Sequence, residues 1–175
     1  MRLPALTHLI EVTFALSHSK RICVFGSSAL LASFPELGDP GQPLEISYDA
    51  DLLVEPCDEQ LAAMLHEAVG EGSLFAQRTG YHADFLRPSI TETLPPGWDG
   101  RLIALPGVVQ SGALAPADLA VVKLRVGRAK DLTLCRHLVA GGMLTAHEIR
   151  ARLDTMTLDE AETVRVYRRL QEVSE

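Results

Sequence analysis

The chain has 175 residues, of which 47% are hydrophobic and 22% charged, with a net charge of −7. This composition is typical of a folded globular protein, and no apolar run approaches the roughly 20 residues of a membrane helix, so we expect no membrane partner. Three widely spaced cysteines (Cys23, Cys57, Cys135) and six histidines without HxH or HExxH spacing disfavour a disulfide framework and a zinc site. We therefore expect a cytoplasmic protein.

The first 115 residues alternate between helix and strand patterns. Helices are predicted at 4–16, 29–34 and 58–69, and strands at 21–25 and 45–54, with a Pro- and Gly-rich loop at 35–43. Residues 74–78 and 81–87 are expected to pair as strands across a hairpin turn at Thr79-Gly80. Further short strands are expected at 101–105 and 108–109.

From Pro116 the pattern is helical. Helices are predicted at 118–125 and 130–139, joined at Gly127, and capping boxes at Thr145 and Thr157 predict two more. The expected fold class is therefore α+β (α/β), with a mixed-sheet core at 1–115 and a C-terminal helical region at 116–175. The first part carries 6 Lys and Arg against 14 Asp and Glu (net −8), and the second carries 10 against 9 (net +1).

Gly26 and Ser27 stand where a buried strand turns into the next predicted helix. Glycine lets the backbone approach a ligand, and the first amides of a helix, here at Ser27 and Ser28, suit a phosphate. Gly-Ser is also an ordinary helix N-cap, so this dipeptide alone does not define a site.

Three carboxylates follow. In a strand, Asp49 and Asp51 share one face about 7 Å apart, where a cation between them would relieve their repulsion. Asp84 completes a triad if its strand neighbours theirs, and His82 on the same face is expected to be a partly buried neighbour rather than a ligand. The alternative is a solvated acidic surface.

The last cluster consists of Lys123, Arg125, Arg128, Lys130 and Asp131. Lys123 and Lys130 would share a face of a continuous helix, and a lysine facing the carboxylates would hold a triphosphate. Asp131 would either stabilise the N-terminus of a helix through the helix dipole or orient one of these cations. A solvated basic helix face is the alternative.

Together these residues resemble a nucleotidyltransferase of the DNA polymerase beta superfamily, whose pattern is Gly-Ser, then D-x-D on the next strand, then a later acid. More closely, the chain is similar over about residues 20–153 to uncharacterised bacterial nucleotidyltransferases related to AbiEii-type toxins. Besides Gly26-Ser27, 47–52 and Asp84, the resemblance rests on Leu94-Pro95-Pro96-Gly97-Trp98, Arg101-Leu102, Asp118-Leu119-Ala120, Lys123-Leu124, Arg128, Lys130-Asp131-Leu132 and Ile149 to Leu153.

The resemblance implies a nucleotidyltransferase-like sheet and a helical part that closes over the nucleotide. It implies Mg²⁺ (or Mn²⁺) as cofactor and an NTP as substrate, with transfer of an NMP to a hydroxyl of RNA, a protein or a small molecule. Catalytic and metal-binding roles then fall on Asp49, Asp51 and Asp84. Nucleotide-binding roles fall on Gly26, Ser27, Ser28, Lys123, Arg128, Lys130 and Asp131.

Two other functions stay open. The 23-residue step from Gly26 to Asp49, and the lack of Lys or Arg at 42–47, favour an inactive member of the fold. Such a protein would bind a nucleotide or a partner such as an antitoxin. Nucleic-acid binding through the basic cluster is the third hypothesis, and a net charge of −7 argues against it as the main function.

Overall fold

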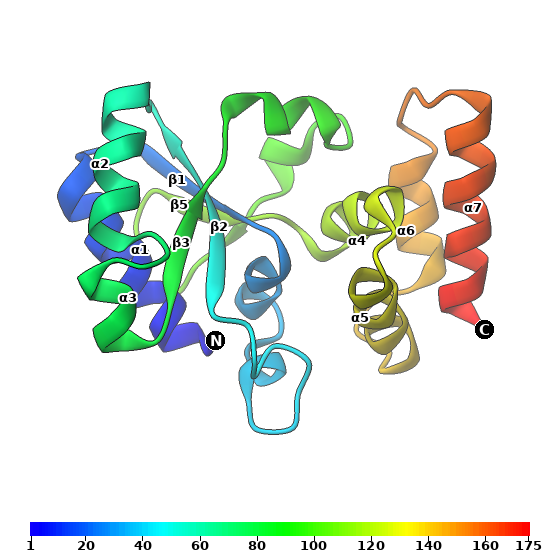
Figure 1. The fold of residues 1–175 in the computed structure, drawn as a ribbon. Helices are drawn as coiled ribbons and strands as arrows, with labels where there is room; N and C mark the ends of the chain where they lie inside the picture. Colours follow the sequence, from blue (N-terminus) through cyan, green and yellow to red (C-terminus); the bar gives the residue numbers. More distant parts are fainter. The chain divides into compact units, whose positions relative to one another are not determined.

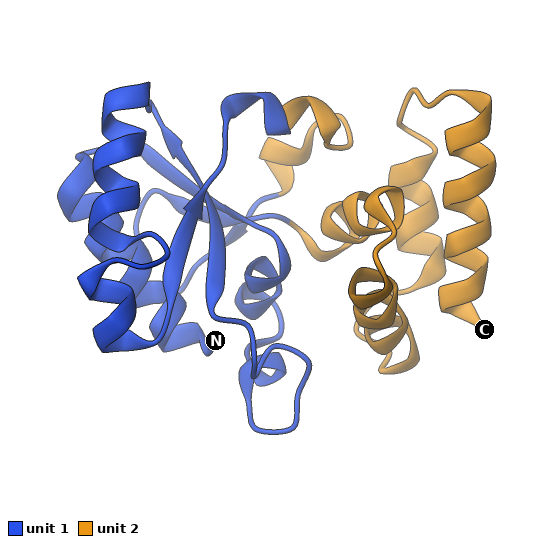
Figure 2. Ribbon diagram, in the orientation of Figure 1, with its two compact units in different colours: residues 1–90, 102–114 blue, residues 91–101, 115–175 orange.

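The computed structural model describes residues 1–175 and divides them into two compact units (Figure 2). The first unit comprises residues 1–90 and 102–114, and the second comprises residues 91–101 and 115–175. Both helices and a mixed sheet are present, so the expected α+β class is confirmed at that level. None of the helices is both long and apolar enough to cross a bilayer.

The first unit is built on a five-stranded sheet with the order β3-β2-β1-β5-β4 (Figure 1). Its strands are β1 (Arg21–Phe25), β2 (Asp49–Glu55), β3 (His82–Phe85), β4 (Ile103–Ala104) and β5 (Ser111–Ala113). The β1–β2 and β4–β5 pairs are antiparallel, whereas the β1–β5 and β2–β3 pairs are parallel. The central strand, β1, is buried along four of its five residues.

Helices gather on one side of this sheet (Figure 1). They are α1 (Leu3–Ser17), α2 (Glu59–Val69) and α3 (Leu74–Thr79), while the short 3₁₀ helices η1 (Ser27–Ala32) and η2 (Pro35–Gly38) follow β1. Leu6, Leu9 and Ile10 of α1 are fully buried, which is the one-sided pattern of an amphipathic helix. The backbone nitrogen of Met1 donates to the Leu44 carbonyl at 2.5 Å and so ties this end of α1 to the segment before β2.

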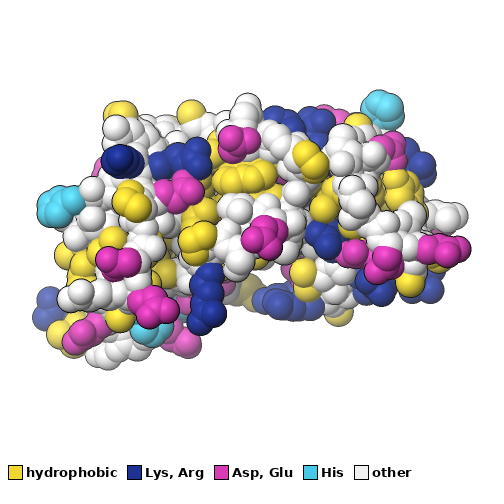
Figure 3. Space-filling view, turned by 90° about the horizontal axis from the view of Figure 1, so that it is seen from above, with side chains coloured by type: hydrophobic (Ala, Val, Ile, Leu, Met, Phe, Trp, Pro, Cys, Tyr) yellow, Lys and Arg dark blue, Asp and Glu magenta, His cyan; other side chains and the backbone are white.

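The second unit contains the four helices expected after Pro116. They are α4 (Pro116–Val126), α5 (Ala129–Ala140), α6 (Ala146–Leu153) and α7 (Glu160–Ser174), and the short η3 (Pro88–Thr93) and η4 (Trp98–Arg101) lie earlier in the chain. Gly127 ends α4 with φ +69, and Thr145 with Glu148 forms the expected capping box of α6. Acidic and basic side chains are interspersed on the face in Figure 3.

The structure corrects several predicted elements. Residues 74–79 form a helix rather than a strand, because the Ser73 side chain accepts from the Ala76 amide and Gly80, at φ +81, ends the helix. Thr79-Gly80 is therefore a helix end and not a hairpin turn. Glycine at positive φ serves both structures equally well, which explains the wrong prediction.

Other corrections concern where elements begin. The strand predicted from residue 45 starts at Asp49, and the one predicted at 108–109 lies at Ser111–Ala113. The last helix is capped by Asp159, whose side chain accepts from the Glu162 amide, and not by a box at Thr157. Aspartate is at least as good an N-cap as threonine, and it stands directly before the apolar helix face.

Candidate functional site

The Gly26 corner brings β1 and β2 together at the end of β1. Phe25, the last residue of β1, is the register partner of Asp51 in the antiparallel pair. Gly26 follows with φ 59° and ψ −165°, a conformation that essentially only glycine adopts. A Cβ at position 26 would lie 1.8 Å from Oδ2 of Asp51. The carboxylate of Asp51 therefore lies against the backbone of Gly26, where any larger residue would collide with it.

The residues after Gly26 do not form the expected α-helix. Ser27 begins a six-residue 3₁₀ helix, so the dipole of a long helix is not available here. Ser28 is buried, and its hydroxyl lies 3.5 Å from the Phe25 carbonyl, to which it donates. Ser27 is half-buried at the corner. The side chain of Ser28 is thus turned into the protein, which leaves its backbone amide as its candidate ligand-binding group.

The acidic residues share one face of the sheet. Along β2, Asp49 is exposed, Ala50 buried, Asp51 half-buried and Leu52 buried, which is the alternation of a strand with one covered face. The parallel β2–β3 pair sets Asp51 opposite Asp84. The condition for an acidic triad, that the Asp84 strand neighbours the D-x-D strand, is therefore met.

His82 belongs to the same array. It is the register partner of Asp49, and its Nε2 lies 4.0 Å from Oδ1 of Asp84. Its side chain is 18% exposed and that of Asp84 is 49% exposed. Four ionisable side chains, two from each strand, thus stand at adjacent positions on one face.

These side chains are not drawn together into a closed metal site. No group of three or more His, Cys, Asp and Glu side chains is arranged to hold a metal ion. The donors on the sheet face nevertheless fit Mg²⁺ in kind, because this ion takes a few carboxylates and keeps water or phosphate oxygens as its other ligands. The exposure of Asp49 and Asp84 leaves room for such additional ligands.

The predicted basic cluster lies in the second unit and is divided between two helices. Because α4 ends at Val126 and α5 begins at Ala129, the helix is not continuous, so the condition under which Lys123 and Lys130 would share a face is not met; the predicted joint at Gly127 is confirmed. Lys123 Nζ donates to Asp131 Oδ1 at 2.8 Å, and both side chains are less than a tenth exposed. Asp131 thus orients Lys123, which was one of its two expected roles.

The other cations of the cluster differ in their surroundings. Arg125 donates from Nε to Glu162 at 2.7 Å and from Nη1 to the Thr93 carbonyl at 2.7 Å. Arg128 is the N-cap residue of α5, and both it and Lys130 are exposed. An incoming anion would therefore meet Arg128 and Lys130 first, whereas Lys123 and Arg125 already have partners.

A buried charge cluster in the second unit was not predicted. Asp118 is fully buried and accepts from Nη2 and Nε of Arg101 at 2.8 and 3.0 Å, with Nε of Arg152 at 3.7 Å. The bond to Asp118 raises the pKa of Arg101 above its ordinary value. Arg101 also donates to the Pro96 carbonyl at 3.0 Å. The Arg101–Asp118 pair therefore holds the Pro-Pro-Gly turn against the first turn of α4. No local sequence pattern predicts this tertiary contact.

A comparison of the chain with protein-family models found no match, and neither did comparisons with curated proteins and with solved structures.

Proposed function

We propose that the protein is a Mg²⁺-dependent nucleotidyltransferase. The observation that carries the proposal is the arrangement at the Gly26 corner. The carboxylate of Asp51 lies against the backbone of Gly26, whose conformation essentially only glycine adopts. The β2–β3 register sets Asp51 opposite Asp84, and Asp49 lies on the same face. This combination of glycine turn and strand-borne acids is what the sequence resemblance implies for a nucleotide-binding site.

In the proposed reaction, a hydroxyl oxygen of the acceptor attacks the α-phosphorus of an NTP. A new P–O bond forms, the bond to the bridging oxygen of the β-phosphate breaks, and pyrophosphate leaves. Asp49, Asp51 and Asp84 would hold Mg²⁺ or Mn²⁺, which neutralises phosphate charge when bound. Asp84 is also the candidate to take the proton of the attacking hydroxyl, because its carboxylate is half-exposed.

The remaining roles follow the resemblance. The backbone at Gly26, Ser27 and Ser28 would contact phosphate oxygens, and exposed Arg128 and Lys130 would add positive charge. Lys123, held by Asp131, would act as an oriented cation. RNA, a protein side chain and a small molecule are candidate acceptors, and the cytoplasm is the proposed location.

The test is transfer of label from an α-³²P-labelled NTP, run with each of the four common NTPs and with cellular RNA and protein as acceptors. We expect labelling by the wild type and at least about a hundredfold less by Asp51→Asn, since the reaction depends on charge stabilisation at this position. Asp39→Asn is the matched control, because Asp39 is an exposed carboxylate of the same unit, paired only loosely with Arg2 at 3.8 Å. Equal labelling by wild type and Asp51→Asn would overturn the assignment.

A second function is favoured by two features of the structure. The acids are not gathered into a metal site, and Lys123 is already paired within its own unit. Both would suit an inactive relative that binds a nucleotide or a protein partner such as an antitoxin. Calorimetry with Mg·NTP separates the two: binding without pyrophosphate release supports the inactive relative, and pyrophosphate release supports the enzyme.

A further inference from the structure

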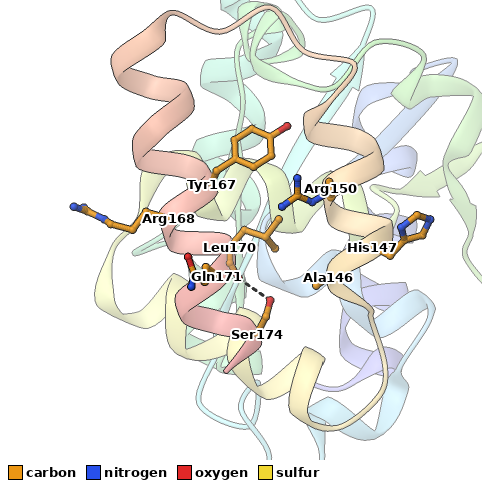
Figure 4. Close-up of a pocket in the computed structure, with 8 residues that line it drawn as sticks. All are labelled: Ala146, His147, Arg150, Tyr167, Arg168, Leu170, Gln171 and Ser174. Carbon is orange, nitrogen blue, oxygen red and sulfur yellow. Dashed lines mark hydrogen bonds between the residues drawn. The ribbon is translucent and has the colours of Figure 1, made fainter.

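Helices α6 and α7 enclose an open groove in the second unit, with a volume of about 640 Å³. Its lining has no carboxylate, although the protein as a whole carries a net charge of −7. The lining residues are Ala146, His147, Arg150, Tyr167, Arg168, Leu170, Gln171 and Ser174 (Figure 4). The polar groups of this lining come from two arginines, a histidine, a tyrosine, a glutamine and a serine, and none of them is acidic.

Arg150 occupies the centre of this groove. It reaches from α6 toward α7, and its guanidinium carbon lies 5.1 Å from the ring centroid of Tyr167 (Figure 4). It forms no salt bridge; Glu148 caps α6 at Thr145, and Asp154 accepts from the Tyr167 hydroxyl. A charged group held over an aromatic ring and without a carboxylate partner is well suited to an incoming anion.

Two further donors stand at the rims. His147 on α6 and Arg168 on α7 point away from each other, on opposite sides of Arg150 (Figure 4). Arg168 has only an exposed pair with Glu172 at 3.5 Å, which a phosphate can replace at little cost. An extended anion that crosses the two helices would meet all three side chains.

We infer that the α6–α7 groove binds single-stranded nucleic acid. Arg150 and Arg168 would contact phosphates of the strand, and the Arg150–Tyr167 pair would offer a planar surface on which a base can stack. Leu170 is only 3% exposed, so the lining offers no exposed aliphatic side chain larger than alanine to anchor a protein helix. This inference goes beyond the proposed transfer reaction and does not depend on it.

A neighbouring hollow on α7 has acidic as well as basic residues in its lining, unlike the groove. That hollow is lined by Asp159, Glu160, Ala161, Val164, Arg165 and Arg168, so both signs meet there. Arg165 lies on the same helix, is exposed and is not part of the groove. It therefore provides a matched control for charge reversal.

The experiment measures fluorescence anisotropy of a labelled single-stranded RNA of about twelve nucleotides, with the full chain and without NTP or Mg²⁺. We expect binding that weakens as salt rises from about 50 to about 200 mM. Arg150→Glu and Arg168→Glu should each weaken binding about tenfold and reduce the salt slope by about one, whereas Arg165→Glu should change it less than about threefold. Circular dichroism checks folding, and Arg168→Glu, on an exposed site, serves if Arg150→Glu does not fold.

Competition identifies the ligand. Unlabelled RNA or DNA strands should displace the probe, and mononucleotides at the same phosphate concentration should not. The inference is overturned if the wild type shows no salt-dependent binding or if Arg165→Glu weakens it as much as Arg150→Glu. It is also overturned if a mononucleotide or an acidic peptide competes as well as the strand. Because no transfer is measured, these outcomes are separate from those that test nucleotidyl transfer.

Discussion

The carboxylate of Asp51 occupies the space that a side chain at Gly26 would need. A Cβ there would lie 1.8 Å from Oδ2 and 2.8 Å from Cγ of Asp51. Gly26 of the Gly-Ser turn and Asp51, the second acid of the D-x-D strand, therefore form one structural feature, although 24 residues lie between them in the sequence.

Gly26→Ala should harm both stability and the site. The backbone conformation of Gly26 alone costs a residue with a Cβ about 1–3 kcal/mol, and Asp51 must also move away. We expect a larger loss of unfolding free energy than for Gly41→Ala, whose φ is +80 but whose surroundings are open within 4 Å. Urea denaturation measures the loss. Equal losses for the two variants would show that Asp51 does not occupy that space.

Gly127→Ala should destabilise the helical unit through Arg169. The Arg169 guanidinium donates from Nη1 to the carbonyls of Leu124 and Arg125, at 2.7 and 2.8 Å, and a Cβ on Gly127 would lie 2.0 Å from its Cζ. Gly142 has the same φ of +69 with nothing within 4 Å, so Gly142→Ala measures the backbone cost alone.

We expect Gly127→Ala to cost about 1 kcal/mol more than Gly142→Ala, because the Arg169 guanidinium must swing away and give up its two hydrogen bonds. In an Arg169→Ala background, this difference should disappear. A double-mutant cycle in urea tests it, and a difference that persists without Arg169 would contradict the contact.

Asp118→Asn should be destabilising. It removes the buried carboxylate that pairs with Arg101, whose side chain is 27% exposed, and the loss of these charge-assisted hydrogen bonds costs about 1.5–3 kcal/mol. Glu92→Gln, at an exposed carboxylate of the same unit, should change stability by less than about 0.5 kcal/mol. Thermal and urea unfolding compare the two, and similar stabilities would show that the pair contributes little.

Cys135 should make stability depend on alkaline pH. Burial raises the pKa of its thiol to about 11 from 9.0, with the charge of Lys123 opposing that rise. Below pH 9 the thiol is neutral in both the folded and the unfolded chain, so it does not make the free energy of unfolding depend on pH. From pH 9 to about 11 only the unfolded chain loses the proton, so unfolding becomes easier by up to about 1.4 kcal/mol per pH unit.

Urea denaturation of the wild type and Cys135→Ala between pH 8 and about 10.5 measures this effect. The wild type should lose more stability over the upper part of that range than the variant does. Parallel pH profiles for the two proteins would contradict a raised pKa.

Local patterns predicted much of the sheet and of the acidic face. The alternation of side chains along a strand predicts that Asp49 and Asp51 share one side. The sequence does not show whether the Asp84 strand lies beside theirs, and the β2–β3 register shows that it does. The start of β2 was harder to predict, because Ile46 and Tyr48 alternate with polar residues as in a strand, yet residues 45 and 46 lie in a turn and residues 47 and 48 in irregular structure. Apolar content alone does not define where a strand's pairing begins.

The sequence left open which charged residues contact one another. The burial of Lys123 against Asp131 depends on where α4 ends, which Gly127 decides, and the Asp118–Arg101 pair joins residues 17 apart through tertiary packing. Likewise, Arg150 and Tyr167 line one groove only because α6 and α7 pack together. Charged residues in a sequence look alike whether they are solvated or paired, so the exposed cations were identified only from the fold.

The most direct test of the central claim is binding of Mn²⁺, followed by electron paramagnetic resonance with a non-hydrolysable NTP. We predict that nucleotide increases Mn²⁺ binding by the wild type and by Asp39→Asn, and that Asp49→Asn, Asp51→Asn and Asp84→Asn each weaken it by at least about tenfold. Unchanged Mn²⁺ binding in all three acidic-face variants would contradict a metal–nucleotide site on this sheet.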